Sequence, residues 1–246
     1  MRLFRLAFAL LLLAAASAGA QTVSTVVVPV VGSTFGPTMI RWMTDVELIN
    51  ESALEVDVAL ELTSAPEAPA FFITMAPGQT QRFTDIVAQA FGFDGRLSPL
   101  RVTTAGRRAI TVRARAYAVR AGEISPPQPI DVYNLDTWHP MRVLDGLGFS
   151  DDLRTNVGLV NLSDQEADFI LGLQRVPGRD IAKTVIRVGA GSIVHMSIQS
   201  LFPLISKGYG FSVVVETPVR DTHVYASVIE NATNSAKFIA PRVGTR

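Results

Sequence analysis

The sequence predicts an all-β protein built from two similar halves. First, residues 44–52 (TDVELINES) return as residues 155–163 (TNVGLVNLS), with apolar, amide and hydroxyl residues at matching positions. Second, this match continues without a gap for roughly twenty residues, which is how a repeated folding unit shows itself in sequence. Third, many short segments alternate apolar and polar residues between turn-forming residues, without long helical patterns. Together these observations indicate antiparallel β-sandwiches related by an internal duplication.

Residues 1–20 are predicted to be an export signal that is cleaved from the mature chain. Arg2 and Arg5 supply a basic start. Residues 6–16 are an apolar run too short to span a bilayer, and residues 18–20 (AGA) provide the small side chains of a cleavage site. The mature chain of about 226 residues is long enough for two domains with their own cores. We expect a periplasmic or extracellular protein without a membrane span in its mature chain.

Charge and cysteine content exclude several classes of function. The chain has 22 basic and 22 acidic residues and no long basic run, which argues against a nucleic-acid partner. It has no cysteine, which excludes a thiol nucleophile, a cysteine metal site and disulfide staples. Each domain must therefore be stabilised by its hydrophobic core.

The first domain is predicted to span residues 21–120. We expect a leading edge strand at residues 23–31, because this run is rich in β-branched residues and contains Pro29. Thr84 is placed to begin a short helix and Gly92 to end it. Further strands are expected at residues 54–62, 71–75, 99–104 and 109–119, in addition to the repeated stretch.

The second domain is predicted to span residues 141–246 and to repeat this order. Residues 121–140 contain four prolines and little apolar periodicity, so we expect a stiff linker or a loop across the domain interface. In the second domain, a helical turn is expected at residues 197–205. The expected strands are residues 141–147, 168–175, 184–188, 211–216 and 223–229.

Short strands at close spacing favour two tandem immunoglobulin-like antiparallel β-sandwiches, each with one short helical turn. Asn50 and Asn161 end equivalent strands, where an amide side chain can bond the backbone of its own turn. The segments VPV (28–30), WMTDVELIN (42–50), LRTNVGLVN (153–161) and YASVIEN (225–231) resemble uncharacterised secreted bacterial proteins with tandem immunoglobulin-like repeats. The resemblance covers nearly all of the mature chain and implies a fold without implying a reaction.

No catalytic residue, cofactor site or metal site is predicted. His139, His195 and His223 lie on different expected elements, and neither a zinc-binding spacing nor a nucleophile-elbow pattern occurs. Ser192 is read as part of a turn that corresponds to Pro77-Gly78 in the first half.

One acidic loop leaves an alternative open. Asp145, Asp151 and Asp152 surround a Gly-Leu-Gly turn, and oxygen ligands on a loop could hold calcium. The spacing lacks the order of a calcium-binding loop. A solvated turn is therefore the favoured interpretation.

The leading functional hypothesis is an exported, non-enzymatic binding or structural module for adhesion, surface assembly or an envelope scaffold. Its partner would be a protein or glycan of the cell envelope. Trp42 and Trp138 precede the two repeats and could lie at the domain junction, either buried or available for stacking on a sugar or peptide.

Two alternatives come from other classes. A periplasmic chaperone of the pilus-assembly type would use residues 23–31 as a lending edge strand and Arg113 or Arg115 as an anchor. An envelope-polymer hydrolase would need paired carboxylates, such as Asp151 or Asp152 facing Glu123.

Overall fold

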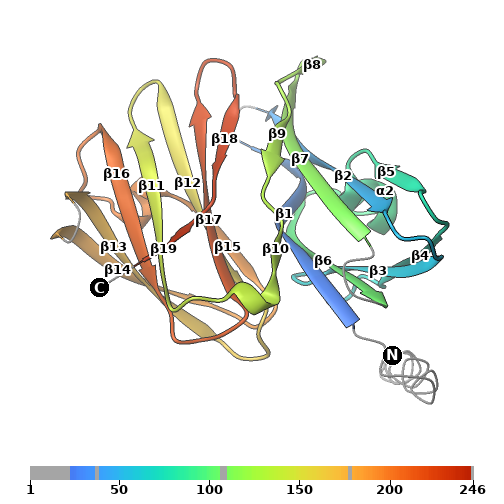
Figure 1. Ribbon diagram of the computed structural model, residues 1–246. Helices are drawn as coiled ribbons and strands as arrows, with labels where there is room; N and C mark the ends of the chain where they lie inside the picture. The colour runs from blue at the N-terminus through green and yellow to red at the C-terminus, as the bar shows by residue number, and fades with distance from the viewer. Residues whose placement is uncertain (1–22, 37–38, 106–109, 177–178, 245–246) are drawn as a thin grey trace.

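A computed structural model describes residues 23–36, 39–105, 110–176 and 179–244. Within these residues the protein is nearly all β, with antiparallel sheets and two short α-helices. The all-β prediction is therefore confirmed. The predicted signal, residues 1–20, lies outside the described residues. Figure 1 shows the first half of the chain on the right and the second half on the left, with β17 and β18 beside β1, β9 and β10 in the middle.

We call the first half, β1 to β10, unit 1. One layer has the order β4-β3-β6-β1, and β2 pairs with both β5 and β7 in the other layer. Three residue pairs between the end of β1 and the start of β2 join the two layers into one continuous sheet. The strands are β1 (Val23–Phe35), β2 (Arg41–Asn50), β3 (Val56–Leu62), β4 (Phe71–Met75), β5 (Thr80–Phe83), β6 (Arg96–Ala105), β7 (Ile110–Arg120), β8 (Glu123–Ile124), β9 (Gln128–Ile130) and β10 (Tyr133–Asn134).

We call the second half, β11 to β19, unit 2. Its two sheets are separate, with the orders β14-β13-β16-β11-β19 and β15-β12-β17-β18. The strands are β11 (Met141–Phe149), β12 (Leu153–Asn161), β13 (Ala167–Val176), β14 (Arg179–Val188), β15 (Ile193–Ser197), β16 (Gly208–Glu216), β17 (Thr222–Glu230), β18 (Ala236–Ile239) and β19 (Arg242–Val243).

The two units place their strands in the same order. The layer β4-β3-β6-β1-β10 of unit 1 corresponds to β14-β13-β16-β11-β19 of unit 2, and β5-β2-β7-β9 corresponds to β15-β12-β17-β18. In an immunoglobulin domain the first strand pairs with the second, and the last two strands share a sheet. In unit 1, β1 pairs with β2 over three residues, whereas in unit 2 the first strand, β11, pairs with β16, and β17 pairs with β12. The antiparallel all-β arrangement is shown, and its immunoglobulin-like character stays a prediction.

β1 is a central strand, which corrects the prediction of a leading edge strand. It lies between β6 and β2 and also pairs with β10. Pro29 is accommodated because the register with β6 shifts between Val28 and Val31, so no ladder hydrogen bond is required from the proline. A β-branched, proline-containing run therefore predicted a strand correctly, while its position in the sheet depended on pairings that are distant in sequence.

Each unit has one helix between its fifth and sixth strands. α2 (Ile86–Phe91) begins after Asp85, whose carboxylate accepts from the Ala88 N–H, so Asp85 replaces the predicted cap Thr84. Asp85 is buried and also accepts from Ser33 and Arg41, which fixes the helix against β1 and β2. Gly92 ends α2 with a positive φ of 70°, as predicted.

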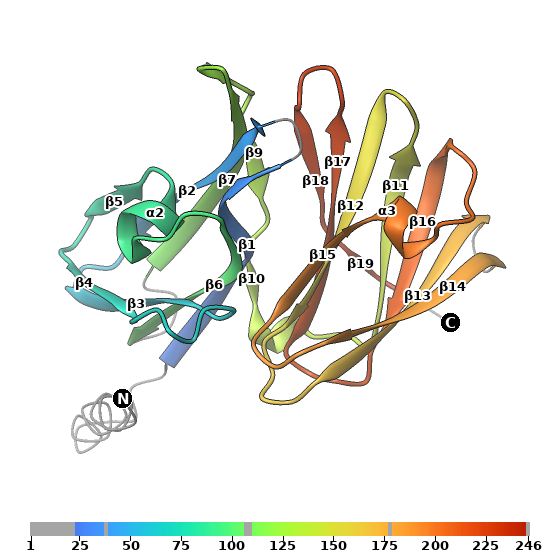
Figure 2. The ribbon, with the colours of Figure 1, turned by 180° about the vertical axis from the view of Figure 1, so that it is seen from behind.

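α3 (Ile198–Leu201) is shorter than the predicted turn. The Ser197 hydroxyl accepts from the Ser200 N–H and caps the start. The helix ends before Pro203, which cannot continue the hydrogen-bond ladder. Figure 2 shows α2 and α3 on the side of the molecule that faces the viewer. No helix among the described residues is long and apolar enough to cross a membrane.

Asn50 and Asn161 form the same hydrogen-bond network in the two units, as the repeat predicts. Each is fully buried, and its amide nitrogen donates to three backbone carbonyls at distances of 2.7–3.0 Å. Each amide oxygen accepts from the N–H and hydroxyl of the serine two residues later, Ser52 or Ser163. The two asparagines thereby tie the end of one strand to the following turn and to the segment before β5 or β15.

The hydrophobic core of unit 1 continues into unit 2. Val160, Leu162 and Tyr225 of unit 2 belong to the same buried cluster as β1, β2 and β6 of unit 1. Unit 2 has a second cluster of its own between its two sheets. The predicted linker, residues 121–140, contains β8, β9, β10 and the 3-10 helix η3 (Leu135–Thr137), and its strands pair with β7 and β1. This segment therefore extends unit 1 before it leads into β11.

Candidate functional site

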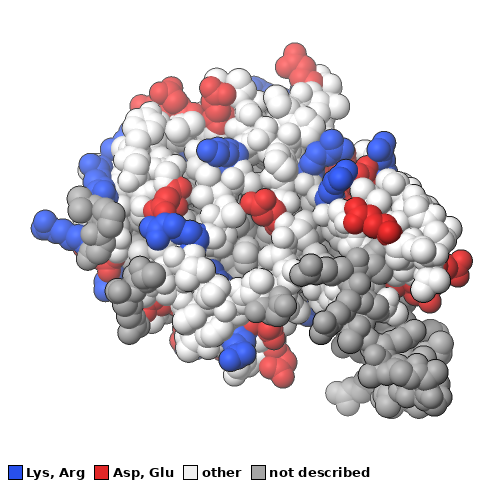
Figure 3. Space-filling view, viewed as in Figure 1, with Lys and Arg blue, Asp and Glu red and all other residues white. Residues whose placement is uncertain are grey.

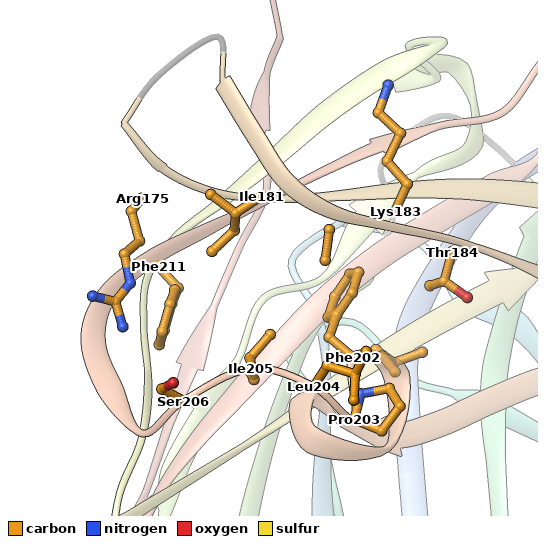
Figure 4. Close-up of a pocket in the computed structure, with 12 residues that line it drawn as sticks. Arg175, Ile181, Lys183, Thr184, Phe202, Pro203, Leu204, Ile205, Ser206 and Phe211 are labelled. Carbon is orange, nitrogen blue, oxygen red and sulfur yellow. The ribbon is translucent and has the colours of Figure 1, made fainter.

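A groove on unit 2 runs between β14 and the segment that follows α3. Its volume is about 600 Å³. Consecutive residues 181–184 of β14 form one wall, and residues 201–206 form the other. Figure 4 shows Phe202 and Phe211 between these walls, with Arg175 at one end. A groove of this size is within the range of ligand and peptide sites.

The wall formed by β14 is the free edge of a sheet. β14 is the terminal strand of the order β14-β13-β16-β11-β19 and is ten residues long. Its outer edge therefore carries backbone N–H and C=O groups without a strand partner in the described part of the chain. Because four consecutive residues line the groove, the strand presents its edge to it as well as one face.

Large apolar side chains are exposed along this groove. Leu204 is 98% exposed, because Pro203 ends α3 and turns the next residue outward. On β14, Ile181 and Val185 are 50% and 58% exposed. A soluble protein seldom gathers such side chains at an open sheet edge unless the surface is used, since exposed edges favour association.

Two cations flank the groove. The Arg175 guanidinium lies 4.8 Å from the centroid of the Phe211 ring, and a side chain at Gly208 would collide with it, so the glycine makes room. Lys183 forms an ion pair of 3.0 Å with Asp180. Hydrogen bonds from Gln174 and Lys183 hold the pKa of Asp180 below its ordinary value. Arg175 forms no ion pair with a described residue and is available for an acidic group.

The groove offers hydrogen-bonding edge, apolar contacts and one unpaired cation, which suit binding of an extended peptide segment. Among the described residues, the lining of the groove contains no histidine, cysteine or carboxylate. The wider surface is mixed in charge. On the face in Figure 3, Lys and Arg side chains are interspersed with Asp and Glu side chains.

The two tryptophans lie at the junction between the units, at opposite ends of β1. Trp42 pairs in register with Thr34 near the end of β1 and lines a junction cavity of about 220 Å³. Trp138 follows η3, near the start of β1, and its indole N–H donates to the Thr222 hydroxyl at 3.2 Å. Both are half-buried, and they do not form a paired stacking surface.

The same junction cavity contains two further groups that the sequence did not mark. Tyr225 is 1% exposed, and its hydroxyl has no hydrogen-bond partner among the described residues. The His195 ring lies 5.8 Å from the Tyr225 ring, centroid to centroid. Although His195 retains accessible surface, the surrounding protein lowers the pKa of His195 to about 4. The ring is therefore neutral at pH 7.

The residues of the alternative hypotheses are not brought together. Arg113 and Arg115 are exposed on β7, where Arg113 forms an ion pair of 3.3 Å with Glu47. Residues 23–31 of β1 pair with β6 and, at Val26 and Val27, with β10, so this segment is not the edge strand that the chaperone hypothesis named. Asp151 pairs with Lys207 in unit 2, while Glu123 lies on β8 in unit 1. Among the described residues, no hydrogen bond or ion pair joins the carboxylates that the hydrolase hypothesis requires.

The acidic loop and Ser192 have structural partners. Asp145 accepts from Ser212 at 2.6 Å and pairs with Arg242, which holds the pKa of Asp145 below its ordinary value. Within the described ranges, no group of three or more His, Cys, Asp or Glu side chains is arranged to hold a metal ion. The Ser192 hydroxyl donates to the Ala190 carbonyl in a turn, as predicted.

Sequence reasoning missed the β14 groove. The alternation of residues 181–188 was visible, yet only residues 184–188 were predicted as a strand. The signal that could have found the edge is the apolar residues at 181 and 185 on a face that also carries Lys183 and Arg187. Charges interspersed with apolar side chains are common on edge strands.

Comparisons with known proteins assign no family. No family model matches the chain, and no curated protein matches it. The structure titled "Crystal Structure of Thermotoga maritima 1070" is 13% identical over 44% of this chain and 95% of that chain, with a TM-score of 0.36.

A second similarity is to Bacteroides uniformis β-glucuronidase 2, covalently bound to cyclophellitol-6-carboxylate aziridine. It is 11% identical over 82% of this chain and 25% of that chain, with a TM-score of 0.18. A calcium-binding mutant of that enzyme gives the same values. At these TM-scores the similarities support no conclusion about function.

Proposed function

We propose that the protein is an exported, non-enzymatic binding module that takes up an extended segment of a protein partner along the edge of β14. The observation that carries this proposal is the free ten-residue edge beside a groove of about 600 Å³ with Leu204 98% exposed. An added strand would complete the backbone hydrogen bonds of β14 and cover these apolar side chains.

The chemistry of the groove defines the partner segment. Backbone pairing with β14 requires an extended chain without proline at the positions that donate hydrogen bonds. Alternate side chains of that segment would face Phe202, Leu204 and Ile181, so they should be apolar. Arg175 calls for one acidic side chain at the end of the groove.

We also propose that the two units descend from one duplicated sandwich. The shared strand order and the matching networks of Asn50 and Asn161 support this proposal. Secreted bacterial proteins with tandem sandwich repeats remain the proposed relatives, and the cell envelope or the medium remains the proposed location of the partner.

The test is an affinity capture with the mature chain, residues 21–246, from native envelope extract and culture medium. Wild type is compared with the double variant Leu204→Ser/Ile181→Thr and with the control Ile124→Thr. Ile124 is also apolar and 65% exposed, but it lies on β8 of unit 1. We expect one polypeptide that wild type and the control retain and the groove variant loses by about tenfold or more.

Hydrogen exchange on the purified complex then locates the contact. Binding should slow exchange of the amides of residues 180–187, which include the free edge of β14. A partner that the groove variant retains at full strength, or that leaves these amides unprotected, would contradict the proposal.

A further inference from the structure

A second hollow lies at the junction, beside β10, β11 and the start of β17. Its volume is about 310 Å³. Its apolar lining includes Pro29, Val132 and Pro241. Its polar lining includes groups from three elements that are distant in sequence: Arg142 on β11, Tyr133 on β10 and His223 on β17. We call this hollow the junction cleft.

Arg142 is a buried cation without an anionic partner. Its residue is only 5% exposed, and its Nη2 donates to the Thr222 carbonyl at 2.6 Å. Among the described residues, Arg142 takes part in none of the ion pairs. Burying a charge costs several kcal/mol on the order-of-magnitude scale unless a partner compensates it. The carbonyl of Thr222 is neutral, so the charge of Arg142 is left without a compensating anion among the described residues.

Tyr133 and His223 also line the cleft. The Tyr133 hydroxyl is buried and lacks a hydrogen-bond partner in the described part of the chain. The Tyr133 ring stacks on the His223 ring at 3.8 Å between centroids and an interplanar angle of 9°. This stacking restrains both rings beside Arg142 in the lining of the cleft.

The charges around the cleft set the charge of a ligand. Burial lowers the pKa of Arg142 to about 10, so the guanidinium remains a cation at pH 7. Burial, with Arg142 nearby, lowers the pKa of His223 to about 3, so the imidazole is neutral. Arg242 also borders the cleft but is paired with Asp145. Asp131 lies on the wall and disfavours a second negative charge on the ligand. Asp131 and His139 also line the cleft, and Arg142 is the lining cation that forms no ion pair among the described residues.

We propose that the junction cleft binds a small monocarboxylate, with its carboxylate on Arg142 and its apolar body against Pro29, Val132 and Pro241. A planar carboxylate can accept two parallel hydrogen bonds from a guanidinium. A doubly charged phosphate would leave an excess negative charge next to Asp131. This site is separate from the β14 groove, so the proposal does not depend on the proposed function.

The first test compares benzoate with benzamide, which differ in charge but hardly in shape. Each is titrated into the wild-type protein, and the side-chain Nε–Hε signal of Arg142 is followed by NMR. Benzoate should shift this signal to saturation, and benzamide should bind at least about tenfold more weakly, since charge-assisted hydrogen bonds are roughly twice as strong as neutral ones. Equal binding of the two compounds, or no shift of the Arg142 signal, would overturn the proposal.

A pair of variants sharpens this test. Arg142→Gln should weaken benzoate binding by at least about tenfold. The matched control is Arg154→Gln, which removes another partly buried arginine that donates to Asn231 and Asn234 and does not line the junction cleft. The control should bind benzoate as wild type does. If Arg142→Gln retains full affinity, the proposal is wrong; if that variant does not fold, the wild-type titration decides alone.

Discussion

One cross-strand position shows how the two units differ. In unit 1, Glu47 on β2 pairs in register with Arg113 on β7, and their side chains form an exposed ion pair. The equivalent position of unit 2, counted from Asn50 and Asn161, pairs Gly158 on β12 with Tyr225 on β17. The strands and their register are alike in the two units. The outer face of this sheet is open to solvent in unit 1, whereas in unit 2 it packs against unit 1.

The substitution of side chains at this position creates the junction. A Cβ at Gly158 would lie 2.1 Å from the Tyr225 ring, so only glycine lets the ring lie flat across β12. Tyr225 then stacks on Phe238 at 5.0 Å and joins the hydrophobic cluster of unit 1. The same strand pairing thus carries a charged pair in unit 1 and an uncharged, buried pair in unit 2.

A second difference concerns the sheet edges. The edge strand β4 of unit 1 has five residues, whereas its counterpart β14 has ten. A short edge strand offers few backbone groups to a partner, and a long edge offers many. The outer face of β12 and β17 is thus used within the chain, and the longer edge of β14 is the one that the proposed partner would use.

The largest expected change in the free energy of unfolding tests the asparagine network that the two units share. Asn50→Ala and Asn161→Ala each remove an amide that donates to three backbone carbonyls, through one buried and two partly buried hydrogen bonds. Each change should lower the free energy of unfolding by about 4 kcal/mol, since a buried unsatisfied group costs about 1–3 kcal/mol. Urea unfolding followed by tryptophan fluorescence measures both.

The two asparagine variants are controls for each other. Their costs should agree within about 1 kcal/mol, because the networks match bond for bond. A loss below about 1 kcal/mol in either unit would show that the shared turn is not equivalent in the two halves.

The next largest change in stability tests the cross-strand position at which the two units differ. Gly158→Ala should destabilise the protein by about 3 kcal/mol, because overpacking pushes Tyr225 out of the junction. Glu47→Ala at the equivalent position should have a small effect, since the Glu47 side chain is 15% exposed but its partners Arg82 and Arg113 are 77% and 66% exposed. Thermal unfolding of both variants measures the contrast.

A double variant identifies the cause. Gly158→Ala/Tyr225→Leu should be less destabilised than the sum of the two single changes, because the smaller side chain no longer crosses β12. Strict additivity would mean that the strain at Gly158 does not come from the Tyr225 ring.

Sequence predicted most of this fold but little of the junction. The periodicity of β2, β3 and β13 and the repeat around Asn50 and Asn161 are local signals, and the structure bears them out. The placement of β11 and β17 in different sheets depends on which distant strands pair. The alternation of apolar and polar residues along a strand does not reveal which strand will pair with it.

The candidate sites were hidden for a related reason. Arg142 occurs in an apolar stretch, MRVL, where an isolated cation is usually exposed on one face of a strand. Its burial results from the packing of β10 and β17 over β11, which brings Tyr133 and His223 to it. The exposure of Leu204 could not be predicted from the sequence either, since an apolar residue after a proline can equally well belong to the hydrophobic core.

The smallest effect concerns the pH dependence of the junction. His223 faces Tyr133 on β10 and Arg142 on β11, and its pKa falls to about 3 in the folded protein from an ordinary value of 6.5. As the pH falls below 6.5, the unfolded chain binds the proton first, so stability decreases between pH 6.5 and about 3. One histidine contributes at most about 1.4 kcal/mol per pH unit to this loss. His223→Phe keeps a ring against Tyr133 and should reduce the slope by that amount, measured by urea unfolding at several pH values.

Val224→Ala, a core change on the same strand, should lower stability at every pH and leave the slope unchanged. If His223→Phe also leaves the slope unchanged, the loss of stability at low pH does not come from the junction between the units. The contrast between the two sheet faces would then not affect the pH dependence of the free energy of unfolding.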